Sequence, residues 1–169
     1  MFDNENVIRV QDITYSSAVD GTGFRDVLFV NYCPHRCEGC HNQQTWEIEN
    51  GKDMTVDEVF ECLTKSSITN VTFSGGEPFC QPKALKKLAQ MIKDVGKTIW
   101  IYSGYTFEQL VEDEDKKALL TLCDVLVDGR YIEKEAKLNM RFKGSENQRI
   151  IDIKKSIEQN EIVLFDLEF

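Results

Sequence analysis

The sequence predicts an α/β protein, an open partial (β/α) barrel with a mainly parallel, curved sheet. Apolar residues switch repeatedly between the two-residue period of strands and the longer period of helices. The predicted strands and helices alternate, a pattern that forms parallel sheets with right-handed crossovers. Four complete strand–helix units are too few for a closed eight-stranded barrel. We therefore expect one open domain over residues 1–169.

Local signals give the elements in order along the chain. Capping boxes begin a helix at Thr55 and a helix or helix pair at Thr106. Pro82 suits the first turn of another helix, which Gly96 ends. The two capped helices are expected to reach about residues 65 and 122, and the strands are predicted at 26–32, 71–74, 98–102, 124–128, 149–153 and 162–165.

Composition is that of an ordinary globular protein, with 41% hydrophobic and 29% charged residues. No apolar stretch approaches the roughly 18 residues of a membrane-spanning helix, so no membrane association is expected. The acidic N-terminus lacks the build of a signal peptide, which favours a cytoplasmic location. Six cysteines are then expected to stay reduced. A net charge of −9 disfavours a nucleic-acid partner.

One basic segment departs from this acidic balance. Residues 130–155 contain eight Lys and Arg against four acidic residues. The simplest interpretation is a solvated face of the molecule.

Three cysteines are concentrated in one short loop. Cys33, Cys37 and Cys40 have the spacing C-x3-C-x2-C and directly follow the first buried strand. Cysteine thiolates bind iron–sulfur clusters, and four of them are needed to saturate a four-iron cluster. Three cysteines therefore predict a cluster with one open iron, where a small ligand binds and reacts.

Two other ligand sets remain open at this point. His35 or His41 could complete a structural zinc site, although the second C-x2-C pair of a zinc ribbon is missing from the sequence. Cys80 could act as a fourth cysteine ligand and close the cluster.

The other notable motifs also follow strand ends directly. They are Gly75-Gly76-Glu77-Pro78, Ser103-Gly104-Tyr105 and Asp128-Gly129-Arg130. Because the carboxyl ends of parallel strands share one edge of a sheet, these motifs and the cysteines are expected to meet at one cavity. In the first motif, two glycines allow close backbone approach and a carboxylate can accept a cationic group.

The cysteine loop and the Gly-Gly-Glu-Pro turn together resemble the two defining motifs of the radical S-adenosylmethionine superfamily. The resemblance narrows to the anaerobic ribonucleoside-triphosphate reductase activating proteins. It rests on blocks at residues 21–25, 33–42, 45–46, 102–106, 124–130 and 142–149, which span most of the chain.

This resemblance implies a reaction. Cys33, Cys37 and Cys40 would bind a 4Fe–4S cluster whose open iron chelates S-adenosylmethionine. Reductive cleavage would yield methionine and a 5′-deoxyadenosyl radical, which abstracts hydrogen from a glycine of the large reductase subunit. A low-potential donor such as flavodoxin would supply the electron. The cofactors perform this chemistry, and the protein positions them.

The resemblance also implies residue roles. Gly75, Gly76 and Glu77 would hold the methionine amino group. Gly39, Cys40 and His41 would line the adenosine; many members of the superfamily have an aromatic residue where Gly39 stands, whereas the activating proteins commonly have glycine there. Ser103 would contact the ribose or carboxylate. No catalytic residue beyond the cluster ligands is expected, and Asp128, Arg130, Asn147 and Gln148 match family blocks without an assigned role.

Three alternative functions remain open on the sequence. Pyruvate formate-lyase activating enzyme shares the reaction class but acts on another partner. A 7-carboxy-7-deazaguanine synthase acts on a small molecule. A non-catalytic iron–sulfur or zinc-binding module would contain the same cysteines without cleaving S-adenosylmethionine.

Overall fold

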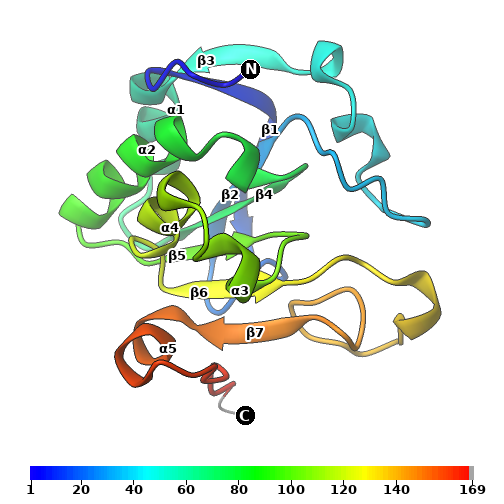
Figure 1. The fold of residues 1–169 in the computed structure, drawn as a ribbon. Coiled ribbons are helices and arrows are strands. Elements are labelled where there is room, and N and C mark those ends of the chain that lie inside the picture. Colours follow the sequence, from blue (N-terminus) through cyan, green and yellow to red (C-terminus); the bar gives the residue numbers. More distant parts are fainter. Residues whose placement is uncertain (168–169) are drawn as a thin grey trace.

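The computed structural model describes residues 1–167, and in them seven strands form one open sheet (Figure 1). The order across the sheet is β3-β1-β2-β4-β5-β6-β7. The central strands are mutually parallel: β2 (Arg25–Val30), β4 (Asn70–Gly75), β5 (Ile99–Tyr102) and β6 (Val125–Asp128). The outer strands pair antiparallel: β1 (Val7–Ser17), β3 (Lys52–Thr55) and β7 (Arg149–Asp152). The predicted open α/β architecture is confirmed.

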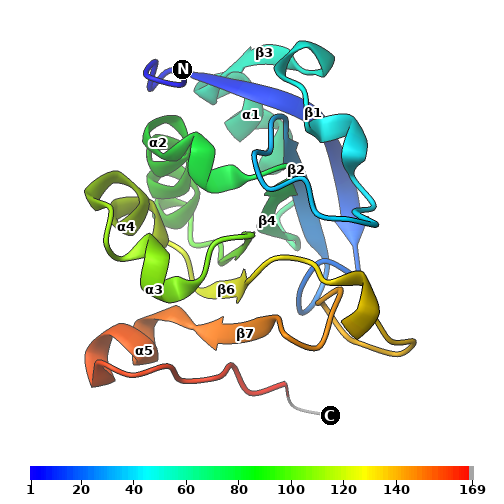
Figure 2. The same ribbon diagram turned by 45° about the vertical axis from the view of Figure 1, so that its right-hand side comes forward.

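Helices α1, α2 and α4 lie together against one face of this sheet (Figures 1 and 2). Both predicted capping boxes form, at Thr55 and Thr106, and the second opens a helix pair. The helices are α1 (Val56–Leu63), α2 (Pro82–Asp94), α3 (Phe107–Leu110), α4 (Glu114–Leu120) and α5 (Ile153–Gln159). Short 3-10 turns are η1 (Gln43–Thr45), η2 (Ile48–Asn50), η3 (Pro78–Cys80) and η4 (Glu133–Glu135).

Strand alternation divides the buried residues into two clusters. In β5, Ile99 and Ile101 point toward the helices and join the main core. Trp100 points to the opposite face, where the rings of Phe142 and Phe165 pack edge-on against it. This second cluster ties the loop after β6 and the C-terminal segment to the back of the sheet.

The expected strand at 162–165 is wrong. This segment makes a single bridge, between Ile151 and Leu164, instead of a ladder. Leu164 is exposed, while Ile162 and Phe165 pack against the two core clusters, so side-chain packing rather than a strand ladder holds this segment. The sequence also gave no sign of β1 and β3, since β1 buries only Ile8 and Val10 of its eleven residues and β3 buries none.

Arg25 forms hydrogen bonds that connect the amino ends of β2, β4 and β5. Its side chain is 2% exposed, and burial lowers the pKa of the guanidinium to about 10, so it keeps its charge at neutral pH. Nη2 donates to the carbonyl oxygens of Val71 (2.8 Å) and Thr98 (3.0 Å), and Nη1 donates to that of Thr22 (3.0 Å). Nε donates to the Thr72 hydroxyl at 3.0 Å. One side chain thus links β2 to β4 and to the start of β5.

We expect Arg25→Met to lower the free energy of unfolding by about 2–4 kcal/mol, because buried carbonyl groups lose their donor. Urea denaturation measures this change. Lys137→Gln is the control, since it removes only the exposed ion pair with Glu146 and is expected to cost less than about 1 kcal/mol. Equal losses in the two variants would contradict the anchoring role of Arg25.

Candidate functional site

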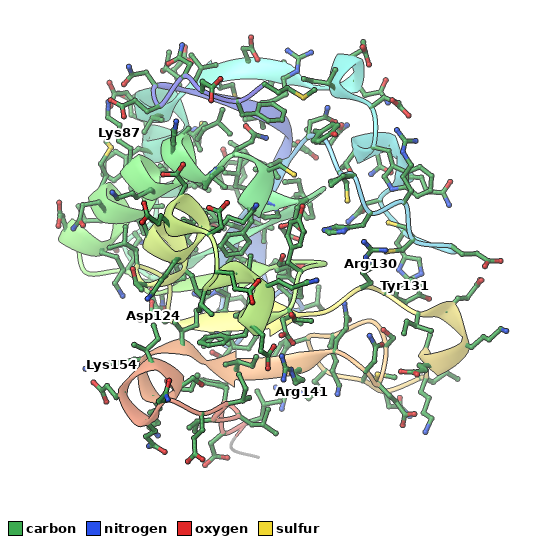
Figure 3. All side chains as sticks on the ribbon, in the orientation of Figure 1. Lys87, Asp124, Arg130, Tyr131, Arg141 and Lys154 are labelled. Atoms are coloured by element: carbon green, nitrogen blue, oxygen red, sulfur yellow. The ribbon has the colours of Figure 1, made fainter. Side chains whose placement is uncertain are left out.

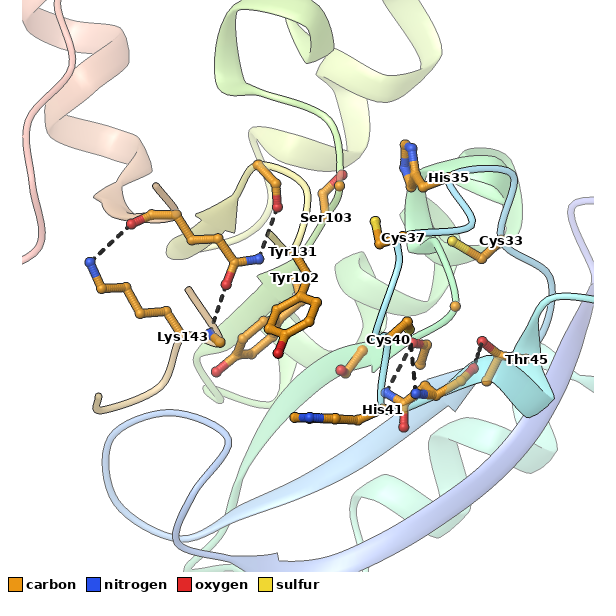
Figure 4. Close-up of a pocket in the computed structure, with 18 of the residues that line it drawn as sticks. Cys33, His35, Cys37, Cys40, His41, Thr45, Tyr102, Ser103, Tyr131 and Lys143 are labelled. Atoms are coloured by element: carbon orange, nitrogen blue, oxygen red, sulfur yellow. Dashed lines mark hydrogen bonds between the residues drawn. The ribbon is translucent and has the colours of Figure 1, made fainter. Parts of the chain in front are cut away.

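A cavity of about 360 Å³ lies at the carboxyl ends of the parallel strands (Figure 4). The loops that follow β2, β4, β5 and β6 all contribute to its wall, so the predicted convergence of the motifs is confirmed. Among the residues lining it are Cys33, Cys37, Cys40, His41, Gly75, Gly76, Ser103, Gly104 and Gly129.

The cysteine loop is a tight, turning segment between β2 and η1. Tyr32, Arg36 and Gly39 all have positive φ, and the Cys40 amide donates to the Cys37 carbonyl at 3.1 Å. The three loop cysteines are half-buried and border the same cavity. Burial raises the pKa of the Cys33 thiol to about 11. The donor set therefore consists of three thiols that face one space, which fits a cluster in which each thiolate binds its own iron.

The zinc alternative lacks support from the geometry of the histidines. His35 Nε2 lies 2.7 Å from Glu77 Oε2, and the His41 ring packs against Tyr131 with centroids 5.5 Å apart. Among the described residues, no group of three His, Cys, Asp or Glu side chains is arranged to hold a single metal ion.

Cys80 borders a different cavity from the loop cysteines. That cavity lies behind the cysteine loop and is lined by Tyr32, Lys83 and Tyr105, among others. Burial, followed by the nearby charge of Glu77, raises the pKa of the Cys80 thiol to about 12. Cys80 thus lines a different cavity from the three loop cysteines, although Cys33 is near enough to raise the Cys80 pKa further.

Glu77 is fully buried and is not among the residues that line the cavity. Ser103 Oγ donates to both carboxylate oxygens, at 2.9 and 3.0 Å. The amides of Phe79 (3.0 Å) and Gly104 (2.8 Å) also donate to the carboxylate. The expected contact between Glu77 and a ligand amino group stays a prediction, and the structure surrounds this carboxylate with donors of the chain itself.

Of the remaining predicted site residues, Gly75, Gly76 and Ser103 line the cavity, and Gly39 lies in the cysteine loop outside that lining. Gly75 and Gly76 follow β4, and the Gly75 carbonyl accepts a bond from Asn42 Nδ2 at 3.3 Å. A Cβ on Gly39 would lie 2.7 Å from Glu133 Cδ, so the Glu133 side chain occupies the space beside Gly39. The Ser103 hydroxyl is engaged with Glu77, and its contact with a ligand remains a prediction.

The loop from Gly129 to Gln148 forms a wall of the cavity, and the sequence analysis anticipated only its start, at the Asp128-Gly129-Arg130 motif. Tyr131 and Phe142 line the cavity, and the Tyr102 hydroxyl donates to the Phe142 carbonyl at 2.6 Å. Arg130 and Tyr131 lie on the side of the molecule that carries the cysteine loop (Figure 3). Their position directly after a parallel strand is the signal that could have identified them.

The residues that match family blocks without an assigned role stabilise the conformation of this loop. Asn147 Nδ2 donates to the Arg130 carbonyl at 2.7 Å, and Gln148 Nε2 donates to the Gly129 carbonyl at 2.9 Å. Buried Asp128 accepts bonds from Arg149, and these bonds raise the pKa of the Arg149 guanidinium. Asp128, Asn147 and Gln148 therefore shape the wall beside the cysteines.

The fold and the three-cysteine cavity together define an iron–sulfur protein of the α/β class. Residues 19–151 match the family described as a 4Fe-4S single cluster domain. In fold, the chain is similar to QueE from Escherichia coli, with a TM-score of 0.53, 16% identity, and coverage of 82% of this chain and 64% of that chain. No helix among residues 1–167 has the length and apolar character to cross a membrane.

Curated relatives then identify the particular family. The chain is 37% identical to the anaerobic ribonucleoside-triphosphate reductase-activating protein of Vibrio cholerae, over 78% of this chain and 90% of the relative. It is 38% identical to the protein of that name from Enterobacteria phage T4, over 78% and 86% respectively. The chain belongs to the family of anaerobic ribonucleoside-triphosphate reductase-activating proteins, as its motifs predict.

Proposed function

We propose that this protein is an activating enzyme that generates a glycyl radical on the large subunit of anaerobic ribonucleoside-triphosphate reductase. The observation that carries the proposal is the 30–38% identity to activating proteins over more than three quarters of the chain. The cavity at the three cysteines supports it, because it combines thiol donors with the Gly75-Gly76 turn in one site.

In this proposal Cys33, Cys37 and Cys40 hold a 4Fe–4S cluster. When both are bound, the cluster would supply the electron that cleaves S-adenosylmethionine into methionine and a 5′-deoxyadenosyl radical. Gly75 and Gly76, which line the cavity, offer backbone groups to the methionine portion. Gly39 and His41 border the adenosine portion, and Ser103 contacts the ribose or the carboxylate. These residues act by binding and orientation, and the reaction needs no general base from the chain.

Besides binding and orientation, the walls of the cavity limit the access of water. Tyr102, Tyr131 and Phe142 place aromatic surface around the cysteines. An aromatic wall favours transfer of a hydrogen atom to the intended partner, since it keeps competing reactions with solvent away.

The setting of this reaction follows from the same family assignment. We propose a single domain over residues 1–169, a cytoplasmic location, and a low-potential donor such as flavodoxin. Neither nucleic acid nor a membrane is expected as a partner, given the net charge of −9.

Anaerobic reconstitution followed by dithionite and S-adenosylmethionine tests the proposal. We expect 5′-deoxyadenosine and methionine in equal amounts. Adding the large reductase subunit is expected to give a glycyl doublet in electron paramagnetic resonance. A protein that binds the cluster but forms no 5′-deoxyadenosine would instead be a non-catalytic iron–sulfur module. Cleavage without a glycyl doublet would point to another substrate.

A further inference from the structure

His35 stands between the first two cysteines and is held against the sheet. Its side chain is 4% exposed, and Nε2 lies 2.7 Å from Glu77 Oε2. The Tyr105 ring packs edge-on against the imidazole, with centroids 4.6 Å apart. A Cβ on Gly104 would lie 2.4 Å from His35 Cδ2. Only glycine at position 104 therefore lets the backbone after β5 come this close to the ring. The imidazole is thus held against the turns after β4 and β5, at the border of the cavity that the three cysteines line.

The Glu77 carboxylate is saturated by donors from three segments. Oε1 accepts bonds from the Phe79 amide and the Ser103 hydroxyl, and Oε2 accepts from that hydroxyl and the Gly104 amide. The carboxylate accepts all of these hydrogen bonds. We therefore infer that it also accepts the bond to His35, and that the imidazole donates from Nε2. A carboxylate offers about four lone-pair sites, and the chain itself fills them.

Other contacts also hold the cysteine loop, among them an exposed ion pair from Arg36 to Glu47 in its interior and two hydrogen bonds at its ends. The Glu77 amide donates to the Tyr32 carbonyl at 2.8 Å, before the first cysteine. Asn42 Nδ2 donates to the Gly75 carbonyl, after the third cysteine. The bond from His35 to Glu77 fastens the stretch between Cys33 and Cys37, in the interior of the loop.

We propose that His35 and Glu77 form a positioning pair, which fixes the cysteine loop so that its thiols face the cavity before the cluster is bound. Glu77 then acts through His35 and the loop, and it makes no direct contact with S-adenosylmethionine. The pair is stable because a buried carboxylate is costly unless hydrogen-bond donors surround it, and His35 is one of those donors. This inference rests on the cluster assignment of the proposed function.

The rate at which the reconstituted cluster loses iron to a chelator tests the pair. Removing one partner of a buried charged hydrogen bond costs about 1.5–3 kcal/mol. For Glu77→Gln and His35→Leu we therefore expect iron release about tenfold faster or more than in the wild type. His35→Gln keeps an N–H donor and is expected to recover much of the difference.

Arg36→Leu is the matched control, because Arg36 lies in the same loop but pairs with the exposed Glu47 instead of a buried carboxylate. We expect its iron release to match the wild type. Circular dichroism of each apoprotein checks folding, and if Glu77→Gln does not fold, the comparison of His35→Leu with His35→Gln decides.

Binding of S-adenosylmethionine to the loaded protein separates positioning from direct contact. We expect the dissociation constant of Glu77→Gln to stay within about threefold of the wild type, less than the effect of one lost charged hydrogen bond. A normal rate of iron release with affinity weakened about tenfold or more would overturn the inference and make Glu77 a ligand contact. A wild-type protein that binds no cluster would instead overturn the proposed function.

Discussion

Replacing Cys37 by alanine is expected to abolish both cluster binding and cleavage of S-adenosylmethionine. Each loop thiolate is predicted to bind one iron, and the remaining Cys33 and Cys40 cannot hold the cluster alone. Iron and sulfide analysis after anaerobic reconstitution should fall to background, and 5′-deoxyadenosine should become undetectable by chromatography. Cys33→Ala and Cys40→Ala should behave in the same way.

Cys80→Ser provides the control for the cysteine variants. Cys80 lies in the cavity behind the loop, together with Tyr105 and Lys83, and does not line the cavity of the three loop cysteines. We expect this variant to bind iron and sulfide as the wild type does and to retain its cleavage activity. Loss of the cluster in Cys80→Ser would show four-cysteine ligation and would contradict the open-iron assignment.

The sequence predicted the centre of the fold better than its edges. The central strands β2, β5 and β6 are rich in apolar residues and β4 buries Val71 and Phe73, so their signal survives in a single sequence. The outer strands β1 and β3 depend on pairing with neighbours, since β3 pairs with β1 and exposes most of its residues to solvent. The segment at 162–165 shows the opposite error, because apolar composition alone does not provide a partner strand to complete a ladder.

The candidate site was predictable to the extent that its residues follow parallel strands. Spacing identified the cysteines, and strand order placed Gly75, Gly76 and Ser103 beside them. One feature depends on contacts between distant segments and was therefore hidden, namely the burial of Glu77 against His35. The loop that contains Tyr131 follows the parallel strand β6, so strand order could have placed it at the cavity as well.

Gly75→Ala is expected to destabilise the protein by about 3 kcal/mol or more. Gly75 has φ +109°, a conformation that costs about 1–3 kcal/mol for residues with a side chain. In addition, a Cβ would lie 2.4 Å from the backbone nitrogen and oxygen of Val30, and these atoms belong to the central strand β2. Backbone atoms of a central strand cannot move aside as a flexible side chain does, so the strain adds to the clash. Urea denaturation of the apoprotein measures the loss.

Gly96→Ala separates backbone strain from the steric clash. Gly96 also has positive φ, at +83°, but a Cβ there meets no atom within 4 Å. We expect the free energy of unfolding of this variant to fall by only the conformational cost of positive φ, about 1–2 kcal/mol. Similar losses at Gly75 and Gly96 would mean that β2 yields to the added methyl group. A clearly larger loss at Gly75 would mean that the turn after β4 is rigid, and that the glycines there are required for the close approach of β4 to β2 beneath the cysteine loop.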